Sequence, residues 1–64
     1  MAKLSYRIFT IEKDETLDSN IYYITRDNGS KFRDPDGIER TIDSIPAESF
    51  EEVTKYIDRV YFGG

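Results

Sequence analysis

The chain has 64 residues and a net charge of −4, with 13 acidic against 9 basic side chains. It contains no cysteine and no histidine, which excludes disulfides, thiolate metal sites and both the commonest general base and the commonest transition-metal ligand. A net negative charge repels phosphate backbones, so sequence-independent nucleic-acid binding is disfavoured. We therefore expect one small domain that binds no metal and no cofactor.

The first apolar segment, residues 3–12, is rich in β-branched and aromatic residues and predicts one long strand. In a regular strand its apolar side chains would divide between the two faces, with Leu4, Tyr6 and Ile8 on one and Phe9 and Ile11 on the other. Either a bulge switches the faces partway, or both faces are covered.

Met1, Ala2 and Lys3 lead directly into this strand without the apolar region of a signal peptide. No apolar stretch approaches the roughly 20 residues of a membrane span, and the absence of cysteine is compatible with a reducing compartment. The sequence therefore predicts a cytoplasmic protein that does not enter a membrane.

A second strand is predicted at residues 21–26, after a polar connector, and it is again apolar on both sides. Asn28-Gly29 follows it. An Asn-Gly pair between strand-like runs favours a type I′ hairpin turn, because that turn needs positive φ at both central residues. The pattern predicts that residues 30–33 return alongside the second strand.

The stretch Asp34-Pro35-Asp36-Gly37 matches a type I turn, with Asp first, Pro next and Gly last. A short amphipathic strand is predicted to follow at residues 38–42. Calcium loops also place several carboxylates beside a glycine, but here the third loop carboxylate and the flanking helices are missing. Turn chemistry accounts for every residue, so we interpret the stretch as structural.

The C-terminal helix is predicted over residues 49–62, where Ser49 and Glu52 match an S-x-x-E capping box. Its apolar residues recur at intervals of three and four and form one stripe, which consists of Phe50, Val53, Ile57, Val60 and Tyr61. The terminal Gly63-Gly64 resembles the diglycine tail of ubiquitin-like sulfur carriers. In those proteins the tail follows a strand and the helix lies in mid-sequence, so a helix stop is the favoured interpretation here.

These elements predict a single α+β domain over residues 1–64. It consists of a small antiparallel sheet, or an SH3-like open barrel, of three or four strands with one C-terminal amphipathic helix packed on one face. Enzymatic activity is not expected. Without histidine the serines have no base beside them, and the carboxylates of Glu12, Asp14 and Glu15 fall in a polar connector where solvent surrounds them.

One helix covers one face of a sheet, so apolar residues on the second face require either a curled barrel or a second protein. The leading hypothesis is a non-enzymatic protein–protein interaction module that binds a larger target, of the kind that phages and mobile elements use as inhibitors or adaptors, alone or as a homodimer. The residues expected to bind the partner are Phe9, Ile11, Tyr22, Tyr23, Ile24 and Phe62.

Two alternatives remain open at this point. In the first, an acidic face mimics a nucleic acid and blocks a DNA- or RNA-binding protein, through Glu48, Glu51, Glu52 and Asp58. In the second, the β surface binds single-stranded nucleic acid directly, through aromatic residues interleaved with Arg7, Arg26, Lys31 and Arg33.

Overall fold

The computed structural model describes residues 3–16, 18 and 20–63. In chain order its elements are β1 (Lys3–Tyr6), β2 (Phe9–Lys13), β3 (Ile21–Arg26), β4 (Phe32–Arg33), β5 (Glu39–Arg40), β6 (Asp43–Pro46) and α1 (Phe50–Val60). The predictions that concern Met1, Ala2 and Gly64 lie outside the described residues.

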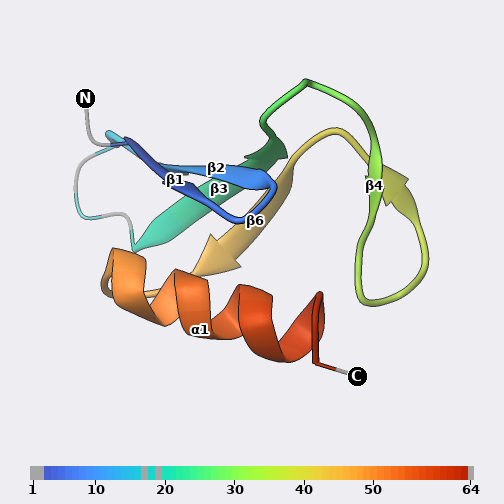
Figure 1. Cartoon of the computed structure of the whole chain (residues 1–64). Coiled ribbons are helices and arrows are strands. Elements are labelled where there is room, and N and C mark those ends of the chain that lie inside the picture. Colours follow the sequence, from blue (N-terminus) through green and yellow to red (C-terminus); the bar gives the residue numbers. More distant parts are fainter. Residues whose placement is uncertain (1–2, 17, 19, 64) are drawn as a thin grey trace.

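Four strands form one antiparallel sheet in the order β1-β2-β3-β6, and α1 lies across one face of it (Figure 1). The sheet stays open, with β1 and β6 as its two edges, so the predicted α+β fold is confirmed as an open sheet with a C-terminal helix. The short strands β4 and β5 pair only with each other and project as an arm beside the sheet (Figure 1).

The long N-terminal strand expected at residues 3–12 is instead a tight hairpin. The chain reverses at Arg7 and Ile8, so that Tyr6 pairs with Phe9 and Leu4 pairs with Ile11. Paired residues of an antiparallel ladder share a face, and all four of these side chains therefore lie on the helix side. Arg7 has a φ of 54°, a left-handed conformation that is uncommon for any residue other than glycine.

This reversal corrects the expected distribution of apolar residues between the two faces. Phe9, Ile11, Tyr22 and Ile24 do not form a second, uncovered face; they lie beneath α1 with exposed fractions of 0–3%. Val53 and Ile57 of α1 and Ile45 of β6 complete the fully buried part of this core. The opposite face carries mostly hydroxyl side chains, because the pairs Ser5–Thr10, Thr10–Thr25 and Tyr23–Ser44 alternate with the core positions.

The predicted type I′ hairpin at Asn28-Gly29 is also wrong. Only Gly29 of the pair has a positive φ, 76°, and the Asn28 side chain instead accepts the Ser30 N–H at 3.0 Å in a local turn. The chain leaves β3 without returning along it, and β6 pairs with β3 from much further along the sequence.

The strand predicted at residues 21–26 is confirmed as β3, whereas the one predicted at residues 38–42 is limited to β5. The predicted turn and the predicted helix cap are also present. The Gly37 N–H donates to the Asp34 carbonyl at 2.9 Å, closing the predicted turn with Gly37 at a φ of 82°. At the start of α1 the Ser49 hydroxyl accepts the Glu52 N–H at 3.3 Å, and the Glu52 carboxylate accepts the Glu48 N–H at 3.0 Å. The helix ends at Val60, and Gly63 lies where a Cβ atom would sit 2.3 Å from the Arg59 carbonyl oxygen.

Candidate functional site

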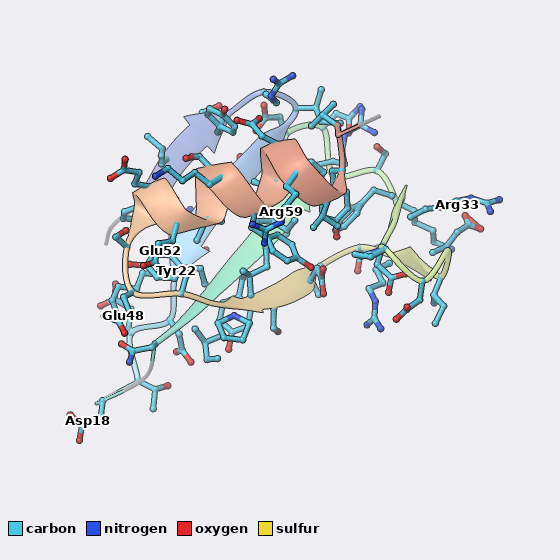
Figure 2. All side chains as sticks on the ribbon, turned by 90° about the horizontal axis from the view of Figure 1, so that it is seen from below. Asp18, Tyr22, Arg33, Glu48, Glu52 and Arg59 are labelled. Atoms are coloured by element: carbon cyan, nitrogen blue, oxygen red, sulfur yellow. The ribbon has the colours of Figure 1, made fainter. Side chains whose placement is uncertain are left out.

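A groove of about 270 Å³ runs between β6 and α1. Its lining comes from the end of β6, the residue that follows it and one side of the helix: Ile45, Pro46, Ala47, Glu52, Lys55, Tyr56 and Arg59. Figure 2 looks onto the helix and shows Glu52 and Arg59 on the side of α1 that faces β6. The groove is therefore bounded by the edge of the sheet on one side and by the helix on the other.

The short connection between β6 and α1 places the helix alongside the strand, and each end of the groove is fixed by hydrogen bonds. At one end, the Glu52 carboxylate binds the Glu48 N–H and holds the connection to the first helical turn. At the other end, the Tyr61 hydroxyl donates to the Asp43 carboxylate at 2.7 Å. Burial, together with this bond, raises the pKa of Tyr61, so the phenol stays protonated and remains a donor.

The outer edge of β6 has no partner strand in the sheet order. The Ala47 N–H donates to the Asn20 carbonyl at 2.9 Å, which places the backbone groups of Ala47 on the β3 side. In an antiparallel ladder this orientation alternates, so the backbone groups of Ile45 also face β3, while those of Ser44 and Pro46 point away from it. Proline has no N–H to leave unpaired there. The edge therefore presents the Ser44 N–H and the carbonyls of Ser44 and Pro46.

The floor of the groove is apolar and its helical wall is charged. Ile45 and Ala47 are 2% and 8% exposed. The half-buried Tyr56 lines the groove from the helix, and burial raises its pKa. The Lys55 ammonium lies 3.7 Å from the Glu51 carboxylate, and both side chains are largely solvated. The Arg59 guanidinium makes no hydrogen bond or ion pair with any residue that the structure describes.

The predicted partner-binding residues do not form one exposed surface. Phe9, Ile11, Tyr22 and Ile24 belong to the core described above. Tyr23 lies on the open face of the sheet, where its hydroxyl donates to the Asp14 carboxylate at 3.1 Å and this bond raises its pKa. Phe62 is 40% exposed beyond the end of α1, and its ring packs under the Arg7 guanidinium, with 4.5 Å between the Arg7 Cζ atom and the ring centroid.

The predicted acidic residues do not form one face either. Glu48 and Glu52 meet at the start of the helix, and Glu51 lies beside Lys55. Asp58 points to the β1–β2 turn, where it accepts hydrogen bonds from the Tyr6 hydroxyl and the Arg7 guanidinium, both at 2.7 Å. Both bonds lower the pKa of the Asp58 carboxyl, and the bond from the Tyr6 hydroxyl makes the larger contribution.

The aromatic surface required for nucleic-acid stacking is largely internal. Phe9, Tyr22 and Phe32 are between 1% and 8% exposed, and Arg7 is paired with Asp58. A stacking surface needs solvent-accessible rings next to free cations, and these residues do not supply it.

Sequence reasoning missed the residues that line the groove. Glu52, Lys55, Tyr56 and Arg59 recur at i, i+3, i+4 and i+7 and so share one side of a helix, but their mixed polarity gives no apolar stripe to detect. Ile45 and Ala47 lie in a segment that we expected to be only an approach to the helix.

Among the described residues, no cluster of three or more acidic or metal-ligating side chains is arranged to hold a metal ion, and no helix has the length and apolar content needed to cross a bilayer. A scan against protein-family models, a search of curated proteins and a search of solved structures each found no match.

Proposed function

We propose that this protein is a non-enzymatic protein-interaction module that binds an extended segment of a partner by strand addition at β6. The observation that supports this proposal is the unpaired edge of β6 lying directly beside the groove. In strand addition, main-chain hydrogen bonds provide affinity, and pockets for alternate side chains provide specificity. The β6 edge supplies the main-chain groups, and the groove supplies the pocket.

The dimensions and chemistry of the groove fit this mode of binding. Successive side chains of an added strand point to opposite faces of the sheet. On the helix side they would enter the groove over Ile45 and Ala47, and on the other side they would lie beside Ser44 and Pro46. The groove volume of about 270 Å³ lies just below the range of about 300–1,000 Å³ that is typical of small-molecule sites, and a groove of this size can receive one or two side chains.

The same surface is suited to an inhibitor or adaptor, because such a protein acts by occupying a segment of another protein. Its cysteine-free composition fits a reducing compartment such as the cytoplasm. Neither role requires a continuous acidic face or an exposed aromatic stacking surface.

Ser44→Pro tests the proposal, with Ser44→Ala as the matched control. Ser44 points its N–H away from β3, so proline at this position removes the outward donor and leaves the β3–β6 hydrogen bonds intact. Both variants, and the parent, are used as baits in cell extract after circular dichroism has confirmed their fold. We expect proteins bound by the parent and by Ser44→Ala to be lost from Ser44→Pro.

Amide hydrogen exchange on the recovered complex then locates the contact. Strand addition predicts slower exchange of the Ser44 amide, while the amides of the open sheet face, such as Thr25, stay unchanged. Equal binding by the proline and alanine variants, or protection confined to other strands, would contradict strand addition at β6.

A further inference from the structure

We infer that the strand that fits β6 best is β6 of a second copy of this chain, which would give a two-fold symmetric dimer with one continuous sheet. This inference rests on the proposed function, since it names the partner at the same edge. Isologous pairing of this kind requires a surface that is complementary to itself under a two-fold rotation. The β6 edge and the groove-facing side of α1 meet that requirement.

The charges along the groove are self-complementary. Antiparallel pairing of two β6 strands places both α1 helices on the same face of the joined sheet and runs them in opposite directions. Glu52 stands at one end of the groove-lining row and Arg59 at the other. The two-fold rotation therefore sets Glu52 of one copy opposite Arg59 of the second copy, and sets Arg59 opposite the second copy's Glu52.

The centre of the row is also compatible with itself. Lys55 and Tyr56 lie midway between Glu52 and Arg59, so the same rotation sets Lys55 of one copy opposite Tyr56 of the second copy near the axis. An ammonium group packs favourably against a tyrosine ring, and the half-buried Tyr56 offers such a ring at the mouth of the groove. The Arg59 side chain, which has no partner among the described residues, gains one in the dimer.

The backbone at this edge is equally suited. Ser44 supplies an outward N–H, and Ser44 and Pro46 supply outward carbonyls, so the strand both donates to and accepts from an identical strand. Ile42, immediately before β6, is 48% exposed and would be covered by the second copy.

The other edge of the sheet lacks these features. On β1 the backbone N–H and carbonyl groups of Lys3 and Ser5 point away from β2, because those of Leu4 and Tyr6 bond to β2. A lysine on an edge strand is a common device against edge-to-edge association. The β6 strand carries no lysine or arginine between Asp43 and Pro46. Its Pro46 removes one outward N–H but keeps an outward carbonyl as an acceptor, and Ser44 keeps both groups, so the two edges are not equivalent.

Charge exchange tests the dimer. The mass of the purified full chain is measured by sedimentation equilibrium from about 10 μM to about 1 mM, where a dimer has twice the 7.5 kDa chain mass. We expect the parent to dimerise, and Arg59→Glu or Glu52→Arg alone to weaken the dimer about tenfold or more, because each sets like charges opposite one another. The double variant, and an equimolar mixture of the two single variants, should restore it.

Two controls separate charge from folding. Glu52→Gln keeps a side-chain acceptor for the Glu48 N–H, so it reports the loss of charge without the loss of the cap. Ser44→Pro should abolish the dimer while leaving the circular dichroism spectrum of the monomer unchanged.

Self-pairing is overturned if the parent remains monomeric at about 1 mM, or if its dimer is indifferent to Ser44→Pro and to charge exchange. A monomeric parent whose extract partner is nevertheless lost in Ser44→Pro would show that β6 accepts a different protein, which leaves the proposed function standing. Failure of the bait experiment together with a monomeric parent would remove both.

Discussion

The β1–β2 hairpin and the β4–β5 hairpin are stabilised in opposite ways. The first is fastened to the rest of the molecule, because the Tyr6 hydroxyl and the Arg7 guanidinium both bind Asp58 of α1. The second forms its turn from hydrogen bonds within its own segment, contacts the core through the Phe32 ring, and projects beside the sheet (Figure 1). One conformation is imposed by tertiary contacts and the other by local chemistry.

Asp34 is the residue that organises the projecting hairpin. Its buried carboxylate accepts the N–H groups of Asp36 at 3.0 Å and Ile38 at 2.9 Å, and it pairs with the Arg40 guanidinium across the turn. These bonds, with that of Arg40 the strongest contributor, lower the pKa of the Asp34 carboxyl. Every partner lies within six residues of Asp34, so the turn is specified within one short segment.

Phe9 joins the two hairpins, and its truncation should have the largest effect. Its ring is 1% exposed and makes edge-on contacts with Phe32 of β4 and with Tyr61, both at 5.2 Å between ring centroids. Phe9→Ala should lower the free energy of unfolding by about 3–5 kcal/mol, which is comparable with the whole stability of a domain of this size. Urea denaturation followed by circular dichroism measures it.

Phe9→Leu is the control for that measurement, because it keeps most of the buried apolar area and should lose clearly less stability. If Phe9→Ala instead unfolded as cooperatively as the parent with a loss below about 1 kcal/mol, the core would not depend on this ring.

Acid should weaken both hairpins, with a local effect at the β4–β5 hairpin and an effect on the whole domain at the β1–β2 hairpin. The pKa values of Asp34 and Asp58 are lowered in the folded state, so each carboxylate stabilises the fold above its unfolded pKa, near 3.8, and loses that effect as the pH falls through its folded pKa. We expect a melting temperature that is unchanged from pH 7 to about pH 5 and declines below about pH 4. A scan of melting temperature against pH measures this.

Single substitutions then separate local from global effects. In Asp34→Asn, amide exchange at Asp36 and Ile38 should accelerate about tenfold while α1 is little changed, since the lost bonds are local. In Asp58→Asn the melting temperature of the whole domain should fall instead. Equal acceleration of exchange throughout the protein in Asp34→Asn would show that the projecting hairpin unfolds only together with the sheet.

The difference between the hairpins also explains how much of the fold could be predicted. The Asp34–Gly37 turn, the strand at residues 21–26 and the Ser49–Glu52 cap rest on neighbouring residues, and their sequence signatures were sufficient. The pairing of β3 with β6 joins residues far apart in the chain, so no short-range pattern indicates it. The groove depends on this pairing and therefore could not be predicted from its own residues.

The β1–β2 turn was missed for a related reason. Hairpin turns are recognised by glycine or asparagine at positive φ, and here the position is held by Arg7 at 54°. Nothing in the neighbouring sequence indicates a turn; the contacts with Asp58 and Phe62 become visible only once α1 is in place. The resulting error placed the core residues Phe9 and Ile11 on the wrong face.

Arg7→Gly should have the smallest effect, because it changes two opposing contributions at once. Glycine adopts the left-handed conformation of this position without strain, which stabilises the turn. The same substitution removes an ion pair with Asp58, in which the side chains are 47% and 43% exposed, and the contact of the guanidinium with the exposed Phe62 ring, and interactions with this much solvent contribute little. We therefore expect the melting temperature to stay within about 4 °C of the parent value.

Arg7→Ala keeps the strain and loses the ion pair, so it should be the less stable of the two. The opposite order, with glycine below alanine, would mean that the hairpin does not require a left-handed residue at position 7 in solution, and the contrast with the Asp34 turn would no longer hold.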